Sequence, residues 1–196
     1  MEPDRTQCRI SDTGTISQTK FEADLDVLIK VSGTLELESA TDFVWTLEQS
    51  RPFVYGRHKT FIKGKNGAPI SAQYHILYSD AFNVPVLWFN FWQSDGRLVP
   101  LHDVWEDMVG DHVADSIRAA PWKAITQAEH PVLGSPWYHI HPCGTADVMA
   151  KKCAPASKNG DTSNYVIRWL SVFGPVARLS VPNQLAKWVD QGTTDY

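Results

Sequence analysis

The sequence predicts a single α+β domain in which an antiparallel meander sheet is flanked by helices. An amphipathic helical segment comes first, strand-like runs with joins too short for crossover helices follow, and mostly helical segments come last. A length of 196 residues suits one domain. We expect this domain to span residues 19–190, between a flexible tail at 1–18 and a short tail at 191–196.

The first expected element is an amphipathic helix. Phe21, Leu25 and Leu28 recur on one face of a 3.6-residue period. Thr19 is placed to open a capping box at the start of this helix. Gly33 is expected to end it, because glycine is a common residue at helix C-termini.

Four strand-like runs come next, separated by turn residues. They cover residues 43–47, 53–62, 72–78 and 86–93. The last run is apolar almost throughout, which is typical of a strand buried on both faces. The sequence Ser94-Asp95-Gly96 predicts a hairpin turn into another short strand at 97–99.

The second half of the chain is predicted to be mostly helical. Short helices are expected at residues 101–109, 121–129 and 165–173. Alternation of side-chain types indicates an extended segment at 137–141, and a last strand is expected at 176–181. We find no repeat and no linker that would divide the chain.

Charge and composition exclude several classes of protein. The chain has 18 basic and 22 acidic residues, a net charge of −4, which argues against a nucleic-acid partner. No apolar run approaches the roughly 20 residues of a membrane helix, and the polar N-terminus lacks the apolar segment of a signal peptide. Three cysteines do not make a disulfide framework. We therefore expect a cytoplasmic protein without a transmembrane segment.

Residues 139–147 are the part of the sequence richest in reactive side chains. Pro142 ends the extended segment, and an apolar helical face begins directly after Cys143. Backbone N–H groups at a helix start can stabilise a thiolate, or an oxyanion on a carbonyl attached to sulfur. Cys143 is therefore the candidate nucleophile. Cys153 lies on the apolar face and is expected to be packing, and Cys8 lies in the polar tail.

Two other interpretations of this segment stay open. His139, His141 and Cys143 alternate along the chain and would point to one side of an extended segment, as the ligands of a metal site do. Pro142 interrupts that segment, however, and no spacing supplies a fourth ligand, so we assign no metal and no cofactor. A cysteine protease with distant partners is compatible with the spacing, but it has no local signature here.

Motifs across residues 72–182 resemble the autophagy-related protein ten family, and they occur in the same order. They are residues 74–79, 84–87, 122–131, 133–134, His141-Pro142-Cys143, 164–165, 169–171 and 174–176. The resemblance implies a ubiquitin-conjugating-enzyme-like fold, which agrees with the order of elements predicted above. The first 70 residues match the family only weakly.

The resemblance also implies a transferase of the autophagy ubiquitin-like conjugation pathway. Such an enzyme accepts autophagy-related protein twelve from its activating enzyme, autophagy-related protein seven, as a thioester on Cys143. It then passes this protein to a lysine of autophagy-related protein five. Tyr74, in the family's Tyr-His strand, is our candidate for a residue that faces and orients the site. His141 is expected to hold the loop or assist, and Thr145 is a candidate oxyanion donor.

Alternatives to this function remain. The related autophagy-related protein three family carries a similar His-Pro-Cys motif and conjugates a different ubiquitin-like protein to a lipid amine. Its long acidic insertion and its N-terminal membrane-sensing helix are not evident here. A non-catalytic module of the same fold, which only binds a partner, is the other alternative.

Overall fold

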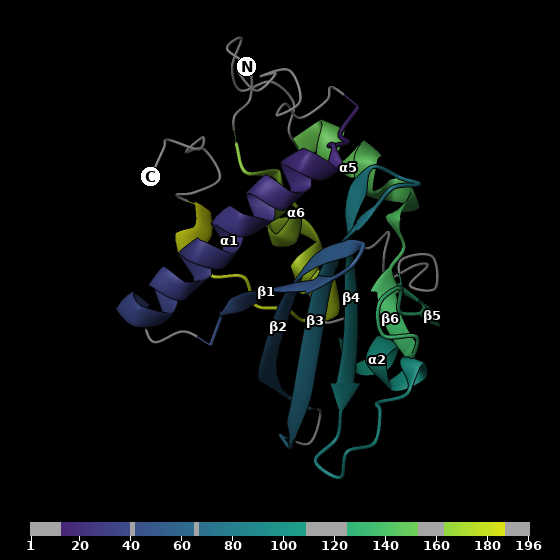
Figure 1. The fold of residues 1–196 in the computed structure, drawn as a ribbon. Helices are drawn as coiled ribbons and strands as arrows, with labels where there is room; N and C mark the ends of the chain where they lie inside the picture. Colours follow the sequence, from purple (N-terminus) through teal and green to yellow (C-terminus); the bar gives the residue numbers. More distant parts are fainter. Residues whose placement is uncertain (1–12, 40–41, 65–66, 109–124, 153–162, 187–196) are drawn as a thin grey trace, which may run out of the picture.

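The computed structural model describes residues 13–39, 42–64, 67–108, 125–152 and 163–186. In this part of the chain the strands form one six-stranded sheet in the order β1-β2-β3-β4-β6-β5, and every neighbouring pair is antiparallel (Figure 1). The strands are β1 (Trp45–Ser50), β2 (Phe53–Lys63), β3 (Pro69–Ser79), β4 (Val84–Trp92), β5 (Ile125–Glu129) and β6 (Pro136–Ile140). The predicted α+β class with a meander sheet is confirmed.

Helices flank this sheet. They are α1 (Gln18–Ser39), α2 (Leu101–Met108), α5 (Thr145–Lys152) and α6 (Tyr165–Phe173), with 3-10 turns η2 (Pro142–Gly144), η3 (Gly174–Ala177) and η4 (Asn183–Leu185). Helices α1 and α6 lie on one face of the sheet, and α5 lies beyond the end of β6, next to the beginning of α1 (Figure 1). No helix in the described ranges is both long and apolar enough to cross a membrane.

The two faces of the sheet carry two separate apolar clusters. Tyr74, Phe89 and Tyr138 form one row across β3, β4 and β6 in the larger cluster, which also includes the buried faces of α1 and α6. On the opposite face a smaller cluster contains Trp88 and Trp137. The alternation along each strand therefore separates a helix-covered core from a second aromatic layer.

Helix α1 begins and ends at different residues from those predicted. The side chain of Ser17, not Thr19, caps its start, because Ser17 Oγ accepts the N–H of Lys20 at 3.2 Å. The helix continues through Gly33 to Ser39. A glycine inside a helix costs about 1 kcal/mol relative to alanine, and burial of Leu35 on the same apolar face more than offsets this.

The predicted helix at 121–129 is wrong over the residues that the structure describes. Residues 125–129 form strand β5, which pairs with β6 in register from Ile125 with Ile140 to Glu129 with Pro136. Residues 121–124 lie outside the described ranges. The pairing partner decides the outcome here, because a run of five residues is too short for its own pattern to separate helix from strand.

Two other predicted strands do not form as expected. Residues 176 and 177 are the end of turn η3, and Arg178 follows in the left-handed region at φ 54°, so no strand forms over 176–181. The segment 97–99 is reduced to a single bridge between Trp92 and Leu98. The other predicted elements, including the helices at 101–109 and 165–173, are confirmed with small shifts of their ends.

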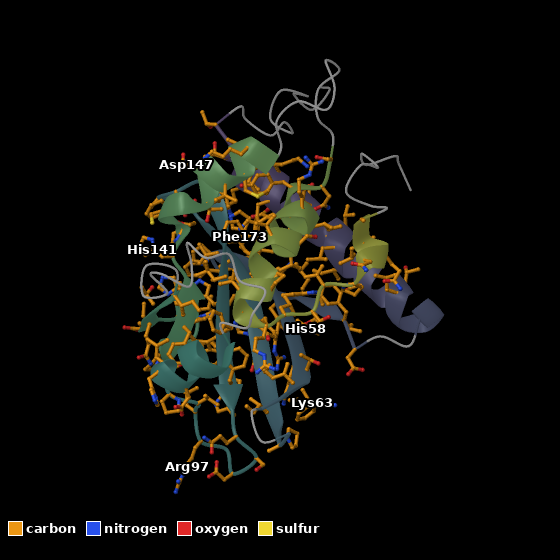
Figure 2. The ribbon with its side chains drawn as sticks, turned by 180° about the vertical axis from the view of Figure 1, so that it is seen from behind. His58, Lys63, Arg97, His141, Asp147 and Phe173 are labelled. Atoms are coloured by element: carbon orange, nitrogen blue, oxygen red, sulfur yellow. The ribbon has the colours of Figure 1, made fainter. Side chains whose placement is uncertain are left out.

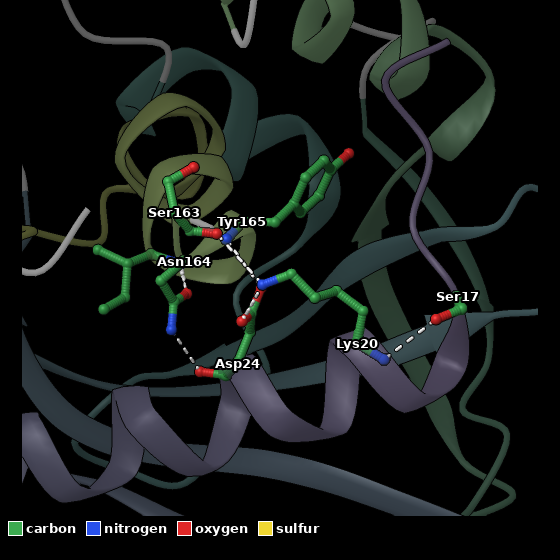
Figure 3. A network of polar contacts seen from close by, with 7 residues as sticks. Ser17, Lys20, Asp24, Ser163, Asn164 and Tyr165 are labelled. Carbon is green, nitrogen blue, oxygen red and sulfur yellow. Dashed lines mark hydrogen bonds and ion pairs between the residues drawn. The ribbon is translucent and has the colours of Figure 1, made fainter. Parts of the chain in front are cut away.

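A buried polar network joins α1 to the start of α6 (Figure 3). Lys20 Nζ lies 2.5 Å from Asp24 Oδ1 and donates to the carbonyl of Ser163 at 3.2 Å. Asp24 Oδ2 accepts the N–H of Tyr165 at 2.8 Å, and Asn164 Nδ2 donates to the carbonyl of Asp24 at 2.9 Å. Burial raises the pKa of the Asp24 carboxyl, while the neighbouring lysine acts in the opposite direction.

The domain limits stay a prediction. Residues 13–17 belong to the expected N-terminal tail, and within them Ile16 is buried in the larger apolar cluster. Residues 1–12 and 187–196 lie outside the described ranges, as do Cys8 and Cys153.

Candidate active site

Local sequence shapes the segment around Cys143 as predicted. Strand β6 ends at Ile140, and His141 keeps an extended conformation with φ −65° and ψ 127°. Pro142 then opens the 3-10 turn η2, because its fixed φ suits the first position of a helical turn. Cys143 lies in this turn, and α5 begins two residues later at Thr145.

Cys143 is exposed and its backbone is held in place. Its thiol is free. Its N–H donates to Nδ1 of His141 at 3.2 Å, so His141 serves as the N-cap of the turn. The N–H of Thr145 donates to the carbonyl of Pro142. These two amide groups are therefore already engaged, and either could serve as an oxyanion donor only if its bond in the turn were broken.

The structure brings His141 and Thr145 to the loop of Cys143 in different ways. His141 is half-buried and contacts the loop through its ring nitrogen. Thr145 is buried at the first position of α5, two residues after Cys143. Figure 2 shows His141 and Asp147 at one end of the molecule, far from Arg97 and Lys63. The proposed roles of His141 and Thr145 remain predictions.

The structure does not bring Tyr74 to this loop, contrary to expectation. Its side chain is fully buried in the core, and its hydroxyl donates to the carbonyl of Ala177 at 3.0 Å. Burial raises the pKa of this phenol above its usual value. Tyr74 lies in one row with Phe89 and Tyr138, and Cys143 lies in the turn beyond the end of β6, five residues after Tyr138.

Sequence reasoning missed a neighbour of the site, Phe82. It lies in the turn between β3 and β4, and its ring meets the ring of His141 edge-on with the centroids 5.9 Å apart. Its side chain is 41% exposed. One sequence feature could have pointed to Phe82: the connection between the predicted strands at 72–78 and 86–93 is short, which places Phe82 at a strand end. Nothing local indicates that β6 ends beside it.

The ring of His139 belongs to the second aromatic layer, and its centroid lies 6.2 Å from that of His141. Its ring stacks on Trp88 at 4.4 Å between centroids, and its Nε2 lies 3.0 Å from Thr126 Oγ1. Burial, and then the neighbouring His141, lower the pKa of His139 to about 4. Among the described residues, no three His, Cys, Asp or Glu side chains gather as a metal ion would require.

Comparisons with known proteins show the family of the chain. The model of the family described as autophagocytosis associated protein, active-site domain, matches residues 15–184. Three similar relatives are each named ubiquitin-like-conjugating enzyme ATG10. That of Homo sapiens is 41% identical over 124 residues, covering 62% of this chain and 55% of the relative. That of Arabidopsis thaliana is 35% identical over 115 residues, covering 57% and 51%.

The ATG10 of Dictyostelium discoideum is 31% identical over 124 residues, covering 59% of this chain and 54% of the relative. The chain thus spans about half the length of the curated relatives that it matches. The expected resemblance to the autophagy-related protein ten family is confirmed by these relatives. Since the family model covers most of its residues, the chain belongs to the family of the autophagocytosis associated protein, active-site domain.

Proposed function

We propose that this protein is an E2-like conjugating enzyme of autophagy that carries a ubiquitin-like protein as a thioester on Cys143. The observation that carries the proposal is an exposed thiol in a short helical turn, capped by His141, in a chain of this family. Exposure matters because the thioester partner and the acceptor are both proteins, which must reach the sulfur from outside.

The proposed chemistry has two steps. In the first, the thiolate of Cys143 attacks the carbonyl carbon of the thioester on the activating enzyme; a new C–S bond forms, and the activating enzyme's cysteine leaves as a thiolate. One thioester replaces another, so the free energy of the exchange is close to zero. The rate therefore depends on how the thiolate is positioned against the carbonyl carbon. In the second, a neutral lysine amine attacks the same carbon, Cys143 leaves as a thiolate, and the nitrogen releases one proton to give an amide.

The partners in this proposal come from the family resemblance. The activating enzyme is autophagy-related protein seven, the cargo is autophagy-related protein twelve, and the acceptor lysine belongs to autophagy-related protein five. The proposal places the reaction in the cytoplasm. His141 holds the backbone of Cys143, and the Thr145 hydroxyl is the proposed donor to the tetrahedral oxyanion of the second step.

A loading assay tests the proposal. The chain is mixed with the activating enzyme, ATP and autophagy-related protein twelve, and the products are separated without reductant. We expect an adduct that dithiothreitol removes. Cys143→Ser should give no adduct or one that resists dithiothreitol, because an oxygen ester replaces the thioester. Cys8→Ser and Cys153→Ser serve as matched controls that should load like the wild type.

A dithiothreitol-sensitive adduct on the Cys143→Ser variant would exclude Cys143 as the acceptor. Adding autophagy-related protein five, or vesicles that contain an amine lipid, then identifies the acceptor class. Discharge to the vesicles alone would favour the lipid-conjugating alternative. Absence of any adduct on a folded wild-type chain would favour the partner-binding alternative.

A further inference from the structure

Gly14 packs its backbone directly against α5, the helix that follows Cys143. Its φ is +74°, in the left-handed region that favours glycine. A Cβ atom at this position would collide with the carbonyl oxygen of Ala146 and lie 2.5 Å from the backbone nitrogen of Ala150. Both contacts are with helix backbone, which cannot swing aside as a flexible side chain can.

The residues around Gly14 are tied to two further elements. The hydroxyl of Tyr165, at the start of α6, donates to the carbonyl of Gly14 at 2.7 Å. The N–H of Ile16 donates to the carbonyl of Asn83 at 3.0 Å, and the hydroxyl of Tyr78 donates to the carbonyl of Ile16 at 2.8 Å. We call residues 13–17 the N-terminal strap. It connects α5, α6 and the turn between β3 and β4.

The strap therefore contacts the supports of Cys143 on both sides. Downstream, α5 begins two residues after the thiol. Upstream, the turn that holds Asn83 also carries Phe82, whose ring contacts His141, and His141 accepts the N–H of Cys143. We propose that the N-terminal strap positions Cys143 for thioester exchange, with Gly14 as its positioning residue. This inference rests on the proposed function.

Helix α5 needs such support from outside. It has only eight residues, too few for a stable isolated helix in water. Of its described residues only Thr145 and Met149 are buried, and the others are half-buried or exposed. Backbone contact with the strap therefore restrains a helix that has little apolar packing of its own.

The test compares Gly14→Ala with Gly96→Ala. Gly96 has a similar φ of +82°, but no atom lies within 4 Å of the position of its Cβ. Both variants carry the strain of alanine in the left-handed region, and only Gly14→Ala adds the collision with α5. The readout is single-turnover loading of Cys143. It is measured at increasing concentrations of the activating enzyme that already carries the ubiquitin-like protein as a thioester.

We expect Gly14→Ala to lower the maximal loading rate by about tenfold to a hundredfold, because small displacements of a reacting group have effects of this size. The half-saturating concentration should change by less than about twofold, because the strap acts on positioning and not on binding. Gly96→Ala should load like the wild type. A change confined to the half-saturating concentration would instead make the strap part of a binding surface and overturn the inference.

Hydrogen exchange supplies a readout that needs no partner. Amides of α5 should exchange at least about tenfold faster in Gly14→Ala than in Gly96→Ala, while those of β3 and β4 stay unchanged. Should Gly14→Ala fail to fold, Tyr165→Phe takes its place, since it removes only the hydroxyl that holds Gly14. The same pattern of a lowered maximal rate with an unchanged half-saturating concentration is expected, with a loss of severalfold.

The outcomes separate the two proposals. Normal loading by Gly14→Ala overturns the strap and leaves the thioester function intact. A wild-type chain that carries no thioester overturns the function. Equal exchange of α5 in Gly14→Ala and Gly96→Ala overturns the strap whatever the loading result.

Discussion

At the residue scale, two side chains expected near the thiol lie in opposite environments. His141 is half-buried and accepts a hydrogen bond from the N–H of Cys143, so its contact is with the loop that carries the candidate nucleophile. Tyr74 is fully buried and bonded to the carbonyl of Ala177, so its contact is with the core. If Cys143 reacts as proposed, a contact with its loop affects the position of the thiol, whereas a contact in the core affects stability. The two residues should therefore separate in experiment.

We expect His141→Ala to slow the loading of Cys143 while the free energy of unfolding changes by less than about 1 kcal/mol, because a partly solvated hydrogen bond contributes little. His141→Asn should restore most of the rate, since asparagine also caps helical turns through its side-chain oxygen. The loading rate is measured by quenching the reaction at successive times, and the free energy of unfolding is measured with urea.

Tyr74→Phe is expected to have the opposite effect, on stability and not on the loading rate. It removes one hydroxyl and leaves the buried carbonyl of Ala177 without that donor, which should cost about 1–3 kcal/mol in unfolding free energy. The loading rate of the folded protein should stay at the wild-type value. Slow loading by a stable Tyr74→Phe protein would return Tyr74 to the site.

At the element scale, two buried histidines connect the turn of the β5–β6 hairpin to β3, beside the smaller apolar cluster. His130 Nδ1 accepts the N–H groups of Val132 and Leu133 at 3.2 and 3.3 Å, which places its ring proton on Nε2. That nitrogen lies 2.9 Å from Nδ1 of His75, and the ring of His75 stacks on Trp137 at 4.5 Å. This hydrogen-bonded arrangement needs both rings to be neutral.

Burial lowers the pKa values of both rings. That of His75 falls to about 3, where His130 and then Arg57 add to the effect of burial, and that of His130 falls to about 4. Both side chains are 1% exposed. In the unfolded chain the same groups bind protons near pH 6.5, so the unfolded state holds more protons at mildly acidic pH.

We therefore expect the free energy of unfolding to fall as the pH drops from 6.5 towards 4. Each of the two histidines should contribute about 1.4 kcal/mol per pH unit in this window. His75→Gln removes one titrating group and keeps an acceptor for His130, so its stability should depend less steeply on pH. Urea unfolding at several pH values between 4.5 and 7 checks this, and equal slopes for both proteins would contradict it.

At the scale of the whole molecule, the Lys20–Asp24 pair joins segments far apart in the sequence. Both side chains are buried, and they bond to residues 163–165 at the start of α6. Removing one partner would leave the other charge buried without compensation. Asp26 and Lys30 form a second pair with the same spacing on the same helix, at 2.8 Å, but their side chains are 51% and 73% exposed.

We expect Lys20→Met to lower the unfolding free energy by about 3–5 kcal/mol, as is typical when one partner of a buried pair is removed. Lys30→Met should change it by less than about 1 kcal/mol, because an exposed pair is screened by water. Chemical denaturation of both variants gives the comparison. Similar losses in the two would mean that the buried pair is not what holds α1 to α6.

Much of the fold follows from local patterns along the chain. The apolar period of 21–28, the strand runs between 43 and 93, and the helix at 165–173 each report which face of an element is buried. The turn at Cys143 could also be predicted from local sequence, because Pro142 fixes its own φ and restricts the residue before it. The family motifs lie in the same part of the sequence, so the candidate nucleophile could be named before any contact was known.

Local patterns in the sequence were therefore enough to predict the class of fold and the family, and to name Cys143 as the candidate nucleophile. Contacts between distant segments make residues 125–129 a strand and place Tyr74 in the core. They also bring Phe82 against His141 and Gly14 against α5. Periodicity shows that a side chain is buried but not what it is buried against. Residues that pack against each other often lie dozens of positions apart in the sequence, so their pairing depends on the packing of the whole chain.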